Sequence, residues 1–220
     1  MSRIITKYPC FLAVVHVVGT TQAINQTRTA VENGADGVFL INHWDEPNTV
    51  PCRVLTEIAM MVRIYFPEIW IGVNYLDLSP EEAFRELPRE ADGLWTDSLR
   101  PLEKLSGGRL RFGGVGFKHQ KKLVTLEQEV KKALLLTDVL TTSGIATGVA
   151  ASTEKIELIR GVAGTEKLIG LASGVTSKNI SLYLPLVNFF LVATGISKSF
   201  TEFDPKKIRE VSDVIKDFKR

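Results

Sequence analysis

Cysteine is scarce in this sequence of 220 residues, which contains only Cys10 and Cys52. Both lie in apolar segments and their spacing matches no metal-ligand motif, so we expect no bound metal. Isolated thiols in apolar surroundings are typical of reduced, buried cysteines, and we therefore expect a cytoplasmic protein, with a disulfide as the weaker alternative. No motif in the sequence predicts a cofactor.

An excess of charge of one sign is also missing, since 27 basic residues stand against 25 acidic ones. Such a chain sets up no overall field that would attract nucleic acid or an anionic membrane, so any anion site must be local. No run approaches the ~20 apolar residues of a membrane span. The apolar run 10–15 faintly resembles a signal peptide, but Pro9 precedes it and His16 interrupts it, so we expect a buried strand and no membrane insertion.

The sequence is rich in apolar, β-prone runs that alternate with amphipathic segments, a pattern typical of parallel strands joined by helices. Eight such units predict a single-domain α/β fold over residues 1–220, a (β/α)8 TIM barrel, with an open doubly wound sheet as the alternative. The connection 99–110 is the weakest, because it leaves room for at most a short turn of helix. The expected strands are 11–17, 37–42, 70–76, 93–98, 111–118, 138–143, 167–173 and 189–195, and the expected helices are 20–33, 52–65, 79–87, 126–136, 153–162, 177–184 and 205–218.

A short motif recurs with a period of two units. Ala35-Asp36-Gly37, Ala91-Asp92-Gly93 and Thr137-Asp138-Val139 lead into the second, fourth and sixth expected strands. Asp and Gly are favoured in helix-to-strand turns in any case, so we favour that simpler explanation over an internal duplication.

Polar residues collect at the carboxyl ends of the expected strands. In (β/α)8 barrels that face carries the active site, so the asymmetry predicts a site there. His16 is in phase with Leu12 and Val14 and is either a general acid or base or a hydrogen-bonded structural histidine. The strand-end residues are His16, Asn42, Asn74, Asp97, Lys118, Ser143, Ser173 and Thr194.

Three of these residues are further candidates for acid–base or positioning roles. Lys118 shares one face of its strand with Gly114 and Gly116, and if that face is the interior, the glycines leave room for the lysine to reach inward. The alternative is a solvated basic loop over 118–122. Asp97 is either the best carboxylate near the axis or a cap for the next turn. Asn42 opens a polar cluster, 42–46, that shows no metal-ligand spacing.

Three consecutive strands, the sixth to the eighth, end in a hydroxyl residue followed by glycine. Glycine lets the main chain approach a ligand closely, and N–H groups of such turns bind anions. We therefore expect a phosphate site, as against glycines that merely permit tight packing. The expected phosphate-binding residues are Ser173, Gly174, Val175, Thr194, Gly195 and Ile196, and the pocket residues beside them are Ser143, Gly144, Thr147 and Asn74.

The segments 143–148 and 172–180 resemble the T/S-G-x-x-T-G turn and the G-S-G-V-T-x-x-N segment of the BtpA/SgcQ family, named for a photosystem I biogenesis protein. The resemblance extends upstream to His16, 34–37, Asn42 with 45–47, and Lys118-His119, and so covers nearly the whole chain. Three family features are absent. Residues 17–21 replace the Pro-Gly segment that follows the first histidine in the family, Ile41 replaces a glutamate, and Gly116 or a neighbour replaces an acidic residue.

The resemblance implies a ribulose-phosphate-binding type of barrel, often grouped with phosphate-sugar enzymes, and implies no agreed reaction. We expect a protein that binds a phosphorylated small molecule, a sugar or nucleoside phosphate, with isomerase or lyase chemistry. The alternative is a non-enzymatic assembly or regulatory factor that keeps the barrel and the anion site, and the missing acidic residues favour it. Barrels commonly self-associate, so a homo-oligomer is among the expected states.

Overall fold

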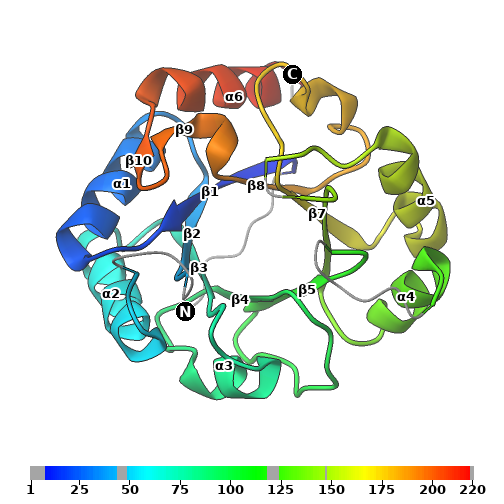
Figure 1. The fold of residues 1–220 in the computed structure, drawn as a ribbon, viewed down its shortest axis with the longest axis horizontal. Helices are drawn as coiled ribbons and strands as arrows, with labels where there is room; N and C mark the ends of the chain where they lie inside the picture. The colour runs from blue at the N-terminus through cyan, green and yellow to red at the C-terminus, as the bar shows by residue number, and fades with distance from the viewer. Residues whose placement is uncertain (1–7, 44–48, 118–123, 147, 219–220) are drawn as a thin grey trace.

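Eight parallel strands close into a barrel in the computed structural model, which describes residues 8–43, 49–117, 124–146 and 148–218 (Figure 1). The strands pair in chain order and β8 pairs back onto β1, so the predicted (β/α)8 barrel is confirmed and the open sheet is wrong. The strands are β1 (Cys10–His16), β2 (Gly37–Ile41), β3 (Trp70–Asn74), β4 (Gly93–Thr96), β5 (Leu110–Gly114), β6 (Val139–Ser143), β7 (Leu168–Ala172) and β8 (Phe189–Val192).

Helices form a ring outside the strands (Figure 1). The expected helix over 177–184 shortens to the 3-10 turn η1 (Ile180–Leu182), and the described connection from β4 to β5 contains no helix. None of the helices in the described ranges combines the length and apolarity of a membrane span. The helices are α1 (Thr20–Glu32), α2 (Cys52–Tyr65), α3 (Pro80–Glu86), α4 (Leu126–Ala133), α5 (Thr153–Ala163) and α6 (Pro205–Phe218).

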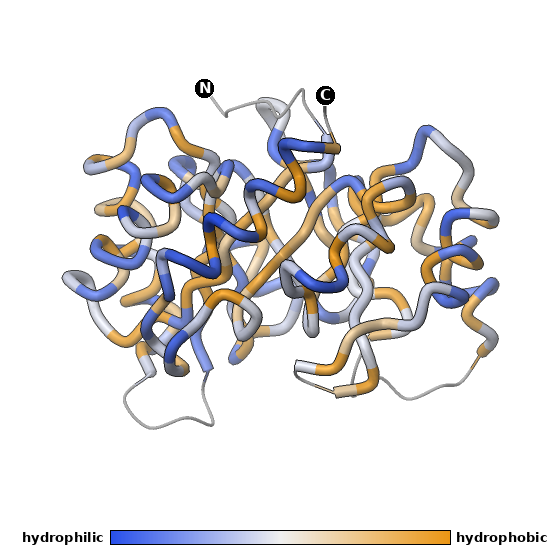
Figure 2. The backbone as a smooth tube through the Cα atoms, turned by 90° about the horizontal axis from the view of Figure 1, so that it is seen from above, coloured by the Kyte–Doolittle hydropathy of each residue, from blue (hydrophilic) through white to orange (hydrophobic). Residues whose placement is uncertain are grey.

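The apolar residues form two cores, one inside the barrel and one between the strands and the helices. Inside, Phe39, Trp70 and Phe112 meet edge to face, with ring centroids 5.0–5.7 Å apart. Aromatic pairs prefer this geometry, and these side chains fill the part of the barrel interior towards the amino ends of the strands. Figure 2 shows the strands as predominantly apolar, whereas the surrounding helices alternate between polar and apolar positions. Side chains therefore close the barrel interior towards the amino ends of the strands, and it can be open only towards their carboxyl ends.

A hydrogen-bond pair repeats four times around the amino-terminal face of the barrel. In each copy, the residue before an even-numbered strand forms two hydrogen bonds with one residue of the preceding odd-numbered strand. Its N–H donates to the carbonyl of that residue, and its side chain accepts the N–H of that residue. The recurring Asp of the sequence motif therefore fixes strand to strand, and the fourth copy carries Asn. The pairs are Asp36 with Phe11, Asp92 with Ile71, Asp138 with Arg111, and Asn188 with Ile169.

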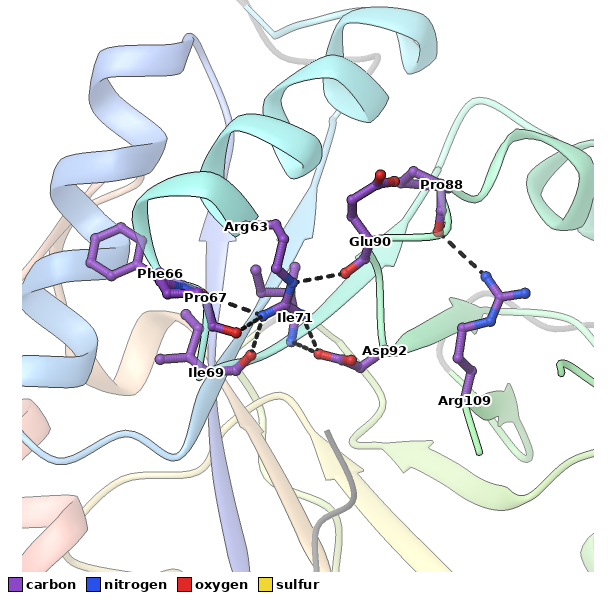
Figure 3. A network of polar contacts seen from close by, with 9 residues as sticks. All are labelled: Arg63, Phe66, Pro67, Ile69, Ile71, Pro88, Glu90, Asp92 and Arg109. Carbon is purple, nitrogen blue, oxygen red and sulfur yellow. Dashed lines mark hydrogen bonds and ion pairs between the residues drawn. The ribbon is translucent and has the colours of Figure 1, made fainter. Parts of the chain in front are cut away.

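One of these carboxylates also belongs to a buried ion pair. Arg63, from the last turn of α2, contacts Asp92 at 2.5 Å and donates further hydrogen bonds to the carbonyls of Glu90, Phe66, Pro67 and Ile69 (Figure 3). Asp92 in turn accepts the N–H of Ile71 at 2.9 Å. Both charged groups are thus satisfied in a region that excludes water, and the network joins α2 to β3 and β4.

The fifth strand is shorter than the sequence predicts. It ends at Gly114, and Gly116 takes a left-handed φ of 52°. A Cβ on Gly116 would face Leu126 and Lys155 of the outer helices, so the inward alternation expected for Gly114, Gly116 and Lys118 breaks at this point. Lys118 itself lies outside the described residues.

Candidate functional site

A cavity of about 330 Å³ opens at the carboxyl ends of the strands. Five of the predicted site residues line it, namely His16, Asn74, Asp97, Ser173 and Thr194. Side chains from both halves of the barrel therefore meet in one pocket. The other lining residues are Val14, Ile41, His43, Leu76, Trp95, Phe117, Gly148, Ala172, Leu191, Ala193 and Phe200.

Strand periodicity explains how the polar residues from the first half of the barrel, His16, His43, Asn74 and Asp97, reach this cavity. Successive side chains of a strand alternate between its two faces. His43 follows Phe39 and Ile41 at intervals of two, so it continues the interior face of β2 beyond the end of the strand. The same alternation, applied to the second strand, would have selected His43 from the sequence in place of Asn42.

His16 and His43 form a cluster with Phe200 at one wall of the cavity. The ring centroid of His16 lies 4.7 Å from that of His43 and 4.1 Å from that of Phe200. Nδ1 of His16 lies 3.0 Å from the carbonyl oxygen of Phe200. A carbonyl can only accept, so the proton of a neutral His16 ring resides on Nδ1 and Nε2 carries the lone pair.

Phe200 lies in the turn of a hairpin formed by β9 (Ser197–Ser199) and β10 (Glu202–Phe203), which no pattern in the sequence predicts. Helix α1 holds this hairpin in place. Gln22 donates to the carbonyls of both His16 and Thr201, and the side chain of Gln26 accepts the N–H of Phe203 at 2.7 Å. The hairpin thus fixes the orientation of the His16 ring through the carbonyl of Phe200.

Asp97 lies beside Asn74, whose Nδ2 is 3.5 Å from Oδ1 of the carboxylate. The main chain of Asp97 lies directly over β5, because a Cβ on Gly114 would come within 2.2 Å of the Asp97 carbonyl oxygen. Gly114 therefore makes room for the backbone of Asp97, and not for a lysine side chain.

Asn42 is buried but does not line the cavity. Its side chain donates to Asp77 at 2.7 Å and to the carbonyl of Val50, and it accepts the N–H of Leu76. Because Asn42 is out of phase with Phe39 and Ile41, it points away from the barrel axis and ties together the loops after β2 and β3. The geometry gives it a structural role, which replaces the catalytic one expected from the sequence.

The loops after β7 and β8 present backbone N–H groups near the cavity. Ser173 and Gly174 both adopt left-handed conformations, with φ of 68° and 67°. Asn179 holds this turn, because its side chain accepts the N–H of Thr176 and donates to the Gly174 carbonyl. Within the described residues, no acceptor receives the N–H groups of Ser173, Gly174, Val175, Thr194 and Gly195.

Ile196 differs from the other residues predicted to bind phosphate. Its N–H donates to the carbonyl of Ala193 at 3.0 Å, and its side chain is buried. It therefore anchors the 3-10 turn η2 (Thr194–Ile196) and offers no donor to a ligand.

The glycines of the three hydroxyl-glycine turns allow the loops to touch one another. A Cβ on Gly144 would lie 1.9 Å from the carbonyl oxygen of Val149, and one on Gly174 would lie 2.1 Å from the N of Ala150. A Cβ on Gly195 would lie 1.8 Å from the carbonyl oxygen of Val175. These contacts are the tight packing that is the alternative explanation for the glycines, and they occur in the same loops as the N–H groups that lack an acceptor.

The loop after β6 contributes less to the cavity than expected. Ser143 and Gly144 do not line it, and the hydroxyl of Ser143 donates to the Gly144 carbonyl at 3.0 Å. Lys155, at the start of α5, donates to the carbonyls of Gly116 and Ser143 at 2.6 and 2.7 Å and so braces the ends of β5 and β6. Thr147 lies outside the described residues.

Replacing Gly195 by alanine should disturb the site without altering any side chain that faces it. The new methyl group would press on the Val175 carbonyl and force the loops after β7 and β8 apart, which should cost about 1–3 kcal/mol of unfolding free energy. Urea denaturation measures this loss.

The matched control is Gly161→Ala in α5. Apart from its chain neighbours and the backbone of its own helix, no atom lies within 4 Å of a Cβ at Gly161. Alanine should stabilise this helix by roughly 0.5–1 kcal/mol. If both substitutions changed stability in the same direction, the close contact at Gly195 would not be the reason.

Among the described residues, no group of three His, Cys, Asp or Glu side chains is arranged to hold a metal ion.

Comparison with known proteins supports the fold and leaves the family open. No family model matches the sequence, and no curated protein does. Solved structures match over nearly the whole chain. Phosphoribosyl anthranilate isomerase from Thermotoga maritima has a TM-score of 0.68 at 16% identity, covering 99% of this chain and 100% of that one. A native KDPGal structure has a TM-score of 0.70 at 14% identity, with 98% of each chain covered.

A third similar structure is the thiamine phosphate pyrophosphorylase from Pyrococcus furiosus, with a TM-score of 0.64 and 15% identity over 95% of this chain and 96% of that one. At such identities the likeness concerns the fold alone. The similarity to the BtpA/SgcQ family therefore stays a prediction from the sequence.

Proposed function

We propose that this protein binds a phosphorylated small molecule, a sugar or nucleoside phosphate, in the cavity at the carboxyl ends of the strands, and acts on it as an isomerase or lyase. The observation that carries the proposal is the pairing of two features in one place. Ser173 and Thr194, whose backbone N–H groups have no acceptor among the described residues, line one side of a cavity into which His16, Asn74 and Asp97 also converge.

The phosphate end of the ligand would be held by main-chain donors. The N–H groups of Ser173 and Thr194, which line the cavity, would gain acceptors from phosphate oxygens, and Gly174, Val175 and Gly195 lie beside them in the same two loops without lining the cavity. Hydrogen bonds to a charged acceptor are about twice as strong as neutral ones. The left-handed turn at 173–174 and the 3-10 turn η2 pre-form this arrangement, so little ordering is needed when the ligand binds.

The reacting end would rely on proton transfers. The contact with Phe200 leaves Nε2 of a neutral His16 as the basic nitrogen, which suits a general base. Asp97, positioned by Asn74, would give or take a second proton. Isomerisation of a sugar phosphate can proceed by such proton transfers. Carbon–carbon bond cleavage also needs a group that takes up the electron pair left on carbon, such as a lysine Schiff base, and Lys118, outside the described residues, remains the candidate for it.

The comparisons agree in kind with this proposal. Two of the similar structures are, by name, an isomerase of a phosphoribosyl compound and a thiamine phosphate pyrophosphorylase. The sequence resemblance to the BtpA/SgcQ family adds support for a phosphate-binding barrel, and membership of that family is part of the proposal, as are a cytoplasmic location and self-association.

The alternative is a non-enzymatic assembly or regulatory factor that keeps the anion site. A filled barrel mouth beside an exposed apolar patch would support it. The cavity is instead open and lined by convergent polar groups, among them His16, Asn74 and Asp97, which favours an enzyme.

The test is a thermal-unfolding screen with matched pairs of a phosphorylated compound and its dephosphorylated form, such as ribose 5-phosphate and ribose. A ligand at a hundred times its dissociation constant adds about 2.7 kcal/mol of stability. For a chain of this size that corresponds to roughly 5–10 °C in Tm.

The Gly195→Ala variant should lose the ligand-dependent rise in Tm, whereas Gly161→Ala should keep it. Equal shifts with the phosphorylated and dephosphorylated compounds, or an unchanged response of Gly195→Ala, would contradict a phosphate site on these loops.

A further inference from the structure

A second cavity, of about 240 Å³, lies at the opposite end of the barrel. It is formed where β5, β6 and β7 begin, far from the carboxyl ends that form the candidate active site. Three basic residues and one acidic residue contribute to it. Its lining consists of Leu102, Lys104, Arg111, Leu134, Leu135, Leu136, Thr137, Asp138 and Lys167.

Arg111 departs from the fourfold repeat of the barrel. The other three residues in its position, paired in the same way with the residue before the next strand, are Phe11, Ile71 and Ile169, all apolar and buried. Packing between strand and helix therefore calls for an apolar side chain here. A guanidinium group in this position, only 8% exposed, needs another explanation.

The hydrogen bonding of Arg111 is incomplete compared with that of two other arginines in the chain. Arg63 donates to five acceptors, including the Asp92 carboxylate, and Arg160 makes six such contacts. Arg111 donates to two carbonyls only, those of Leu102 and Arg100, at 3.0 and 3.1 Å. A guanidinium has five N–H donors, so three of them lack an acceptor within the described residues.

Lys167 supplies a second cation to the same cavity. Its Nζ donates to the carbonyls of Leu134 and Thr137, which leaves one of its three N–H donors. In the described part of the chain, neither Lys167 nor Arg111 has a carboxylate in ion-pair contact. Asp138 is engaged by the backbone N–H of Arg111 at 2.8 Å.

Burial lowers the pKa of both Arg111 and Lys167, and the nearby charge of Asp138 opposes that lowering. Removing two cations from water without a counter-ion in contact costs free energy, and an anion in the cavity would offset this cost.

We propose that this cavity binds a phosphate group, either inorganic phosphate or a small phosphorylated molecule, between Arg111 and Lys167. The planar guanidinium of Arg111 can donate two parallel hydrogen bonds to phosphate oxygens, and the ammonium of Lys167 can donate a third. Lys104, which is exposed on the loop before β5, adds positive charge at the entrance. The site is separate from the candidate active site and would give the protein a second, remote response to phosphate.

The test is a titration with inorganic phosphate, followed by amide NMR shifts, with chloride at equal ionic strength as the reference. The amides of Leu136 and Lys167 report on this cavity, whereas those of Gly174 and Gly195 report on the candidate active site. Each proposal therefore succeeds or fails on its own signals.

Arg111→Ile is the informative variant, because isoleucine occupies the equivalent position at Ile71 and Ile169 and should preserve the fold. It should weaken phosphate binding at Leu136 and Lys167 by roughly tenfold or more, since it removes charge-assisted hydrogen bonds. Arg109→Ile is the matched control: Arg109 also donates to two carbonyls nearby but does not line the cavity, so its loss should leave the shifts unchanged.

Lys167→Met provides a second variant if Arg111→Ile fails to fold, and it should weaken the same signals. The proposal is overturned if phosphate does not shift these amides in the unmodified protein. It is equally overturned if the folded variants bind phosphate as tightly as the unmodified protein, or if Arg109→Ile weakens binding as much as they do.

Discussion

Replacing Arg63 by methionine is expected to lower the free energy of unfolding by about 3–5 kcal/mol, because it leaves the Asp92 carboxylate buried without its counter-ion. The substitution also removes the donors for the carbonyls of Phe66, Pro67, Ile69 and Glu90. Equilibrium denaturation in urea, followed by circular dichroism, measures the change.

The exposed pair of Arg53 and Glu57 on the same helix provides the control. These side chains are 86% and 64% exposed, with 3.6 Å between Nε and the carboxylate. Arg53→Met should change stability by no more than about 0.5 kcal/mol, because exposed ion pairs contribute little. Similar losses for Arg53→Met and Arg63→Met would contradict the importance of burial.

Asp92→Asn separates the ion pair from the hydrogen-bond repeat. Asn188 already occupies the equivalent position, where its side-chain oxygen accepts both the Ile169 N–H and a hydrogen bond from Arg160. An asparagine at position 92 can therefore keep the contacts to Ile71 and Arg63. We expect Asp92→Asn to cost less than Arg63→Met.

The barrel could be predicted from the sequence because most of its strands and helices have their own local signal. Apolar runs mark the strands, and capped helix starts, such as the capping box of Ser79 with Glu82, mark α3, α4 and α5, whereas α1 and α2 have no side-chain cap. The strand ends were less predictable. Where a strand gives way to a loop depends on which neighbouring strand supplies the next hydrogen bond, which a single segment does not encode.

The repeated Asp motif shows a second limit of local reasoning. Asp36, Asp92 and Asp138 looked like ordinary turn residues, and their common role became clear only from the contacts with the odd strands. Asn188 completes the set although the residues around it do not match the motif. Because the partner of the Asp or Asn side chain is a main-chain N–H, the contact does not depend on the side chains of the neighbouring residues.

Strand alternation accounts for part of the candidate site, whereas Ser173 and Thr194 line the cavity one residue after the inward Ala172 and Ala193 and are indicated by their hydroxyl-glycine turns. His16, Asn74 and Asp97 follow the inward positions of their strands and line the cavity. Phe200 lies in a short polar hairpin with no apolar periodicity, so its contact with His16 required the three-dimensional structure.

Asp97→Asn is expected to have the largest effect on function. If Asp97 transfers a proton, the amide cannot replace it, and kcat should fall by about 10²–10⁴-fold in an isomerase or lyase assay on the sugar phosphate that stabilises the protein. The rise in Tm with that ligand should persist, because the proposed phosphate donors lie on the loops after β7 and β8 and not on β4. A loss of kcat without a loss of binding is the signature of a group that acts in the transition state.

Asp77→Asn is the matched control for this prediction. Asp77 lies on the same face of the barrel, but its carboxylate accepts hydrogen bonds from Asn42 and the N–H of Cys52 and does not line the cavity. Its replacement should affect stability and leave kcat within a few-fold, as expected for a residue that transfers no proton. If Asp97→Asn kept full activity, or if both variants lost activity equally, Asp97 would have no chemical role and the acid–base assignment would fall to His16 and the residues around it.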